Sequence, residues 1–104
     1  MASETVSITI LGATGSIGMS TLDVVSRHPD RYQVHALTAN TNWERLLEQC
    51  LSFKPKFAVL NQPGSAAKLS NGLAESGSNT TVLTGTDGLC SVAASDDVDI
   101  VMAA

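Results

Sequence analysis

Residues 6–18 read Val-Ser-Ile-Thr-Ile-Leu-Gly-Ala-Thr-Gly-Ser-Ile-Gly, and their pattern indicates the fold class of the chain. Residues 6–11 are rich in β-branched side chains and have the length of a short strand. Glycines then stand at positions 12, 15 and 18, where a segment with helical apolar spacing begins. A strand, a glycine-spaced turn and a helix in this order are typical of the first unit of a βαβ domain.

The remainder of the chain repeats the alternation of short β-branched runs and longer segments of helical period. We expect strands over residues 6–11, 32–39, 57–60, 81–83 and 98–102. We expect helices over residues 16–28, 43–51, 65–76 and 87–95, the second of them capped by Asn42. This order predicts an α/β fold with a Rossmann-like, doubly wound and mostly parallel sheet, truncated at the fifth strand.

The two ends of the sequence suggest how the chain is organised into domains. Residues 1–5 are expected to form an N-terminal tail, and residues 6–104 a nucleotide-binding domain that is incomplete. The sequence stops within an apolar run from Ile100 to Ala104, and a parallel strand is normally covered by the crossover that follows it. We therefore expect this chain to be the N-terminal piece of a longer protein, with the other domains outside it.

The composition narrows the choice of partners. The 104 residues include six Lys and Arg against ten Asp and Glu, for a formal net charge of -4, which argues against nucleic acid as a partner. There is neither an apolar run that would span a bilayer nor the start of a signal peptide, so we expect no membrane association and a cytoplasmic location. Cys50 and Cys90 are expected to be reduced, buried thiols.

The glycine turn carries the clearest functional pattern. In a dinucleotide-binding turn, the first glycine permits a tight bend, the second lets backbone N–H groups approach a pyrophosphate, and the third lets the helix pack on the strand. Gly12, Gly15 and Gly18 follow this order. The unpaired N–H groups at the start of the helix favour phosphate there, and Thr14 and Ser16 add hydroxyl donors. The sequence predicts dinucleotide binding, with a merely structural turn as the alternative.

The residues after the second predicted strand indicate which dinucleotide. An acidic residue at this place would hydrogen-bond a ribose 2′-hydroxyl and repel a 2′-phosphate. This chain has Asn40, Thr41 and Asn42 instead, and the nearest acid is Glu44. Neutral donors at a helix N-terminus favour phosphate, so the pattern favours NADP, and Arg45 would add charge. The alternatives are that Asn40 and Asn42 only form a turn and a cap, and that Arg45 lies on a solvated helix face.

A group of acidic residues near the C-terminus, Asp96, Asp97 and Asp99, resembles a metal-binding cluster. These residues precede the fifth predicted strand and so belong at the amino end of the sheet, opposite the edge where parallel sheets bind ligands. We therefore expect no metal site in this chain. No nucleophile, base and oxyanion hole are assembled by the sequence, so no catalytic residue is expected either.

Residues 8–29 also resemble the N-terminal sequence of one enzyme family. The run Ile8-Thr-Ile-Leu-Gly-Ala-Thr-Gly-Ser-Ile-Gly18, followed by Ser20-Thr-Leu-Asp-Val-Val25 and His28-Pro29, is similar to the 1-deoxy-D-xylulose 5-phosphate reductoisomerases. Many nucleotide-binding proteins share the glycines, but few continue in this way. Shorter similarities follow at Glu48-Gln49-Cys50 and at Phe57-Ala58-Val59.

The resemblance implies a cofactor site for NADPH in two parts. The first is the turn, with Gly12, Thr14, Gly15, Ser16, Ile17 and Gly18, and the second is the 2′-phosphate loop, with Asn40, Thr41 and Asn42. Family members often carry Gly-Lys-Asn in that loop, and this chain lacks the lysine. This departure affects the strength of the preference for NADP over NAD.

The resemblance also implies an activity for the full-length protein. Family members use NADPH and a divalent metal, Mn, Mg or Co, to rearrange and reduce 1-deoxy-D-xylulose 5-phosphate to 2-C-methyl-D-erythritol 4-phosphate in non-mevalonate isoprenoid biosynthesis. Their catalytic and metal-binding residues would lie beyond Ala104. A phosphorylated sugar as substrate, a homodimer and no turnover by this chain alone are therefore implied.

Two other interpretations of the glycine turn stay open. An NAD(P)-dependent dehydrogenase of another Rossmann family would need a catalytic cysteine or a Tyr-x-x-x-Lys pair, and Tyr32 has no lysine four residues later. A non-catalytic module that senses NADP and binds a partner protein would need neither.

Overall fold

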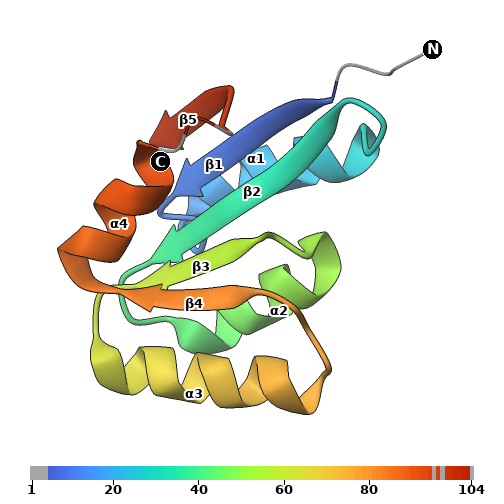
Figure 1. The fold of residues 1–104 in the computed structure, drawn as a ribbon. Coiled ribbons are helices and arrows are strands. Elements are labelled where there is room, and N and C mark those ends of the chain that lie inside the picture. Colours follow the sequence, from blue (N-terminus) through green and yellow to red (C-terminus); the bar gives the residue numbers. More distant parts are fainter. Residues whose placement is uncertain (1–4, 95, 97, 104) are drawn as a thin grey trace.

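Parallel strands form the centre of the fold (Figure 1), and the structure, a computed structural model, describes residues 5–94, 96 and 98–103. The strands are β1 Val6–Leu11, β2 Tyr32–Ala39, β3 Phe57–Leu60, β4 Thr81–Thr84 and β5 Ile100–Ala103. The helices are α1 Ser16–Arg27, α2 Trp43–Phe53, α3 Pro63–Glu75 and α4 Gly85–Ala93. Within the described residues the strand order is β4-β3-β2-β1-β5, and every pairing is parallel. The predicted Rossmann-like α/β fold is confirmed.

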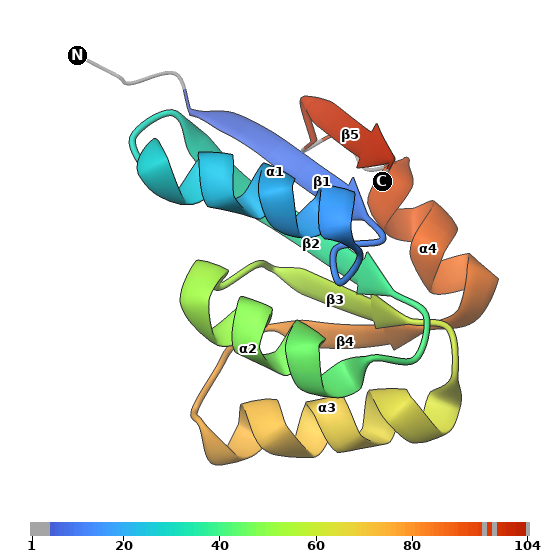
Figure 2. The ribbon, with the colours of Figure 1, turned by 180° about the vertical axis from the view of Figure 1, so that it is seen from behind.

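The connections determine which face of the sheet each helix covers. β1 to β4 are successive neighbours, so their right-handed crossovers place α1, α2 and α3 on one face (Figure 2). α4 instead returns across the other face to β5, which pairs with β1 (Figure 1). The larger apolar core lies under the first three helices and includes Ile10, Leu37 and Leu46. The smaller one, with Ala36, Val59 and Val92, lies under α4.

α2 shows how the sequence pattern produces a packed helix. Its buried residues Leu46, Gln49 and Cys50 face the sheet, and the half-buried Trp43 packs against the same core. The predicted N-cap is confirmed, since Asn42 Oδ1 accepts a hydrogen bond from the backbone N–H of Arg45 at 3.2 Å.

Some predicted boundaries differ from the structure. The third helix begins at Pro63 rather than at residue 65, because proline suits the first turn of a helix, where no intrahelical N–H bond is needed. The fourth helix begins at Gly85 rather than at residue 87, and it ends at Ala93, before the predicted end at residue 95, which itself lies outside the described residues. The fifth strand begins at Ile100, after Asp99 has bonded the start of β1. Of the predicted tail over residues 1–5, only Thr5 is described.

Candidate functional site

The glycine turn joins β1 to α1 at the predicted place. Gly12 has a φ of 76°, a left-handed conformation that favours glycine. A Cβ on Gly18 would lie 2.5 Å from the Gly12 carbonyl oxygen and 2.7 Å from Ala13 Cα, so the close packing of α1 on the turn requires glycine. A Cβ on Gly15 would meet the Gly12 oxygen at 3.5 Å, an ordinary contact. Gly12 and Gly18 therefore shape the turn, and Gly15 leaves room above it.

The N-terminus of α1 suits an anion. Gly15 is its N-cap, no side chain caps it, and its first turn contains no acidic residue. The first N–H groups of a helix lack intrahelical partners and carry the positive end of its dipole. Ile17 is 62% exposed, and it lines a shallow hollow together with Ser16. This helix end therefore presents backbone donors and a hydroxyl group to solvent without a competing carboxylate.

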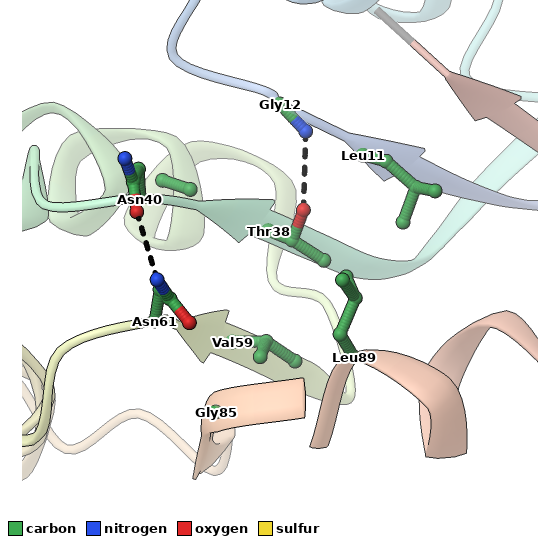
Figure 3. Close-up of a pocket in the computed structure, with 9 residues that line it drawn as sticks. Leu11, Gly12, Thr38, Asn40, Val59, Asn61, Gly85 and Leu89 are labelled. Atoms are coloured by element: carbon green, nitrogen blue, oxygen red, sulfur yellow. Dashed lines mark hydrogen bonds between the residues drawn. The ribbon is translucent and has the colours of Figure 1, made fainter. Parts of the chain in front are cut away.

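A crevice of about 350 Å³ lies at the carboxyl ends of β1, β2 and β3 (Figure 3). Its apolar lining comes from Leu11, Ala39, Val59 and Leu89. Its other lining residues are Gly12, Thr38, Asn40, Asn61 and Gly85. In open parallel sheets, ligands bind at this edge, and an apolar pocket with a few polar groups is the usual form of such a site.

The loop of Asn40, Thr41 and Asn42 borders this crevice through its first residue. Asn40 Oδ1 accepts a hydrogen bond from Asn61 Nδ2 at 3.2 Å, so the two amides are joined across neighbouring strand ends (Figure 3). Thr41 and Asn42 are exposed at the start of α2. The cap uses only the oxygen of the Asn42 amide, which leaves its Nδ2 donor for another partner.

Arg45 lies one helical turn beyond the cap and reaches across to α1. Its Nη1 donates to Met19 Sδ at 3.0 Å, although the side chain is exposed. Its exposure is compatible with both roles that we considered for Arg45, and its charge lies beside the helix that begins at the glycine turn.

The structure brings only part of the predicted set into the crevice. Gly12 and Asn40 line it, whereas Thr14, Gly15, Ser16, Ile17 and Gly18 form the adjoining turn and the start of α1. Sequence reasoning missed Thr38 and Asn61, although Asn61 follows β3 as Asn40 follows β2. Gly85 and Leu89 had no sequence signal, because their place depends on α4 crossing the opposite face of the sheet.

The predictions for Cys50 and Asp99 are confirmed, whereas the prediction for Cys90 is wrong. Cys50 is buried, as expected, but Cys90 is exposed and that prediction was wrong, because α4 turns Gly88 and Val92 inward instead. Ser7 N donates to Asp99 Oδ2 at 2.9 Å, which confirms Asp99 at the amino end of β1, whereas Asp97 lies outside the described residues.

The described residues contain neither a metal-binding cluster nor a helix that would span a membrane. Residues 5–94, 96 and 98–103 contain no group of three or more His, Cys, Asp or Glu that would hold a metal ion. Within the same part of the chain, no helix has the length and apolar character needed to cross a membrane.

A parallel sheet with a glycine turn after its first strand, and a crevice at the adjoining strand ends, defines a Rossmann-like α/β domain. Residues 8–104 match the family model described as 1-deoxy-D-xylulose 5-phosphate reductoisomerase. The chain belongs to this family.

Individual relatives show how much of the chain is shared. The 1-deoxy-D-xylulose 5-phosphate reductoisomerase of Cellvibrio japonicus (strain Ueda107) is 57% identical over 98 residues, which make up 94% of this chain and 25% of the relative. The reductoisomerase of Tolumonas auensis (strain DSM 9187 / NBRC 110442 / TA 4) is 57% identical over 97 residues, or 93% of this chain and 24% of the relative. This chain thus spans about a quarter of the length of the curated relatives it matches.

Solved structures agree with the sequence comparison. A crystal structure of DOX-P reductoisomerase in complex with NADPH, fosmidomycin and magnesium aligns with a TM-score of 0.87 at 41% identity, over 92% of this chain and 23% of that chain. The enzyme from Zymomonas mobilis in complex with NADPH aligns with a TM-score of 0.81 at 43% identity, over 86% of this chain and 23% of that chain.

Proposed function

We propose that this chain is the NADPH-binding part of a 1-deoxy-D-xylulose 5-phosphate reductoisomerase. The observation that carries the proposal is the arrangement at one edge of the sheet. The N-terminus of α1 follows β1, the loop of Asn40, Thr41 and Asn42 follows β2, and the crevice lies between the ends of these neighbouring strands. A dinucleotide needs a phosphate site, a loop that reads the ribose and a pocket for the adenine, and these three features correspond to them.

The residues present fit NADPH. The open space above Gly15 leaves room for the pyrophosphate, which would receive backbone donors of the α1 N-terminus and the hydroxyl groups of Thr14 and Ser16. Gly12, Ile17 and Gly18 complete this part of the site by shaping the turn and the first turn of α1. The apolar lining of the crevice suits an adenine ring.

The end of β2 favours a 2′-phosphate over a free 2′-hydroxyl. β2 ends at Ala39 and is followed by Asn40, Thr41 and Asn42, none of which would repel a phosphate. Asn42 retains its Nδ2 donor beside the N-terminus of α2. These groups are therefore the ones we assign to the 2′-phosphate.

The remaining activity belongs to the whole protein. NADPH, when bound, supplies the hydride for the reduction, and the residues of this chain bind and orient it. We propose that the full-length protein is a cytoplasmic homodimer that converts 1-deoxy-D-xylulose 5-phosphate to 2-C-methyl-D-erythritol 4-phosphate. We place its catalytic residues and its ligands for Mn, Mg or Co outside this chain. The chain alone should not turn over, and NADPH oxidation by it in the presence of substrate and Mn or Mg would contradict this.

Titration of the full-length protein with NADPH and NADH, followed by nicotinamide fluorescence, tests the cofactor assignment. NADPH should bind more tightly than NADH, and 2′-AMP should compete with NADPH far better than 5′-AMP does. Equal competition by the two monophosphates would show that no part of the site reads the 2′-phosphate.

A further inference from the structure

We propose that Gln49 is a positioning residue for the glycine turn: it holds the turn in the conformation that receives the pyrophosphate, without touching the cofactor. This inference rests on the proposed function of the turn. Gln49 lies on α2, on the opposite side of the sheet from α4, and it is not among the residues that line the crevice.

The contact that carries the inference joins Gln49 to the backbone of the turn. Gln49 Nε2 donates to the Ala13 carbonyl oxygen at 2.8 Å, and Ala13 is fully buried. A buried carbonyl that loses its partner carries the cost of its desolvation, so the turn has a strong preference for the conformation that keeps this bond. The bond also assigns the amide, since a carbonyl oxygen can only be matched by the NH₂ end of the glutamine side chain.

The turn is held from a second side by Thr38. The backbone N–H of Gly12 donates to Thr38 Oγ1 at 3.1 Å, and the N–H of Ala13 donates to the Thr38 carbonyl oxygen at 2.8 Å (Figure 3 shows the first of these). Both polar backbone groups of Ala13 are therefore bonded, one to β2 and one to α2. Thr38 lines the crevice and would meet the cofactor, so Gln49 is the residue whose effect on the turn can be separated from ligand contact.

The same helix serves both parts of the proposed site. α2 begins at Asn42, at the loop assigned to the 2′-phosphate, and two turns later it bonds the pyrophosphate turn through Gln49. Backbone donors that are fixed before the ligand arrives bind it more tightly than donors that must first be ordered. Loss of the Gln49 bond should therefore weaken binding at the turn and leave the other end of α2 as it is.

The chemistry of position 49 makes the test specific. Gln49 is 9% exposed, and its Oε1 has no hydrogen-bond partner within the described part of the chain, so the donor at Nε2 is its one bonded group there. Methionine keeps the length of the side chain but cannot donate. A glutamate carboxylate cannot donate either, whereas its protonated form can.

The experiment measures the dissociation constants of NADPH and 2′-AMP for the full-length protein and its variants. 2′-AMP carries the 2′-phosphate and the adenosine but no pyrophosphate. In Gln49→Met, NADPH should bind about fivefold to tenfold more weakly, as expected for one lost hydrogen bond, while 2′-AMP changes less than about twofold. Cys50→Ala, a buried neighbour on α2, is the matched control and should leave both constants unchanged.

Gln49→Glu provides a second readout that a packing defect would not produce. Its NADPH affinity, measured relative to the wild type at the same pH, should recover as the pH falls from about 8 to about 5.5, because the buried carboxyl becomes protonated and can donate to Ala13. Since the reference at each pH is the wild type, this readout does not depend on whether Gln49→Met folds.

The outcomes separate the two proposals. Wild-type protein that is folded but does not bind NADPH overturns the proposed function. Wild-type binding with an unchanged NADPH constant in Gln49→Met, or with equal weakening of NADPH and 2′-AMP, overturns the positioning role alone. A Gln49→Glu variant whose NADPH affinity relative to the wild type is the same at both pH values also overturns it.

Discussion

The α-carbon of Gly18 packs directly against the carbonyl group of Gly12, so that a Cβ on Gly18 would lie 2.5 Å from the Gly12 oxygen. This contact sets how closely α1 approaches the end of β1, and with it the position of the first N–H groups of the helix. Gly15 lies between these two glycines in the sequence but has no such contact, because its own Cβ would be 3.5 Å from the same oxygen. One motif therefore contains glycines that shape the fold and a glycine that leaves space for a ligand.

Gly18→Ala should destabilise the fold. The added Cβ would meet backbone atoms of Gly12 and Ala13, which cannot rotate away, so we expect a loss of about 2 to 3 kcal/mol in the free energy of unfolding. Urea unfolding followed by circular dichroism measures it. Gly64→Ala in α3 is the matched control, since a Cβ there meets nothing within 4 Å and should change the stability little. A Gly18→Ala variant as stable as the wild type would show that α1 can shift freely.

Gly15→Val should weaken NADPH binding and leave the fold intact. The backbone at Gly15 is extended, with φ of -77° and ψ of 170°, which valine adopts readily, so the fold should be retained. The side chain would fill the space proposed for the pyrophosphate, and the dissociation constant of NADPH should rise at least about tenfold. Fluorescence titration and urea unfolding are measured on the same sample. Unchanged NADPH binding in a folded variant would dissociate the turn from the cofactor.

Thr41→Glu should change the choice between cofactors. A carboxylate in the loop after β2 would repel a 2′-phosphate, so NADPH should weaken by about tenfold while NADH changes little. Thr41→Gln has nearly the same shape without the charge and serves as the control. The measured quantity is the ratio of the NADPH and NADH dissociation constants. Equal weakening of the two cofactors by glutamate would place the 2′-phosphate elsewhere.

The elements of this fold were predictable where local signals are strong. Apolar spacing and a cap residue located α2, a run rich in β-branched residues located β1, and a short apolar run located β3. The boundaries of α4 and β5 were less predictable, because tertiary contacts decide them: Asp99 bonds Ser7 of β1 before β5 begins. The exposure of Cys90 was missed for a similar reason, since the inward face of a short helix depends on which strands it crosses.

The sequence predicted which segments border the candidate site, but it did not predict the hydrogen bonds that join these segments. The glycine pattern located the turn, and the residues after β2 located the loop. The Asn40–Asn61 hydrogen bond depends on the pairing of β2 with β3, and the Gln49–Ala13 bond depends on the rotation of α2 about its axis. Each bond joins residues that are far apart in the sequence, so no local pattern predicts it.

The two cysteines should react very differently with iodoacetamide. Cys90 is exposed, whereas Cys50 is buried and its burial raises the pKa of the thiol to about 12, so little thiolate forms near neutral pH. Mass spectrometry of the folded protein should find the label on Cys90 and not on Cys50, and unfolding in urea should expose both. Rapid labelling of Cys50 in the native protein would mean that α2 opens readily from the sheet.

The Cys50 thiol should also make the stability depend on pH in the alkaline range. Burial raises its pKa from 9.0 to about 12, so the folded state holds this proton more tightly than the unfolded state does. The contribution of the protonated Cys50 thiol to the free energy of unfolding is complete below pH 9.0. It declines as the pH rises from 9.0 toward about 12, because the thiol ionises first in the unfolded chain. In Cys50→Ala this part of the decline is absent, while every other titrating group is kept. The difference in free energy of unfolding between wild type and Cys50→Ala, measured in urea across this range, should therefore shrink with rising pH. Two parallel curves would show that the buried thiol ionises as easily in the folded protein as in the unfolded chain.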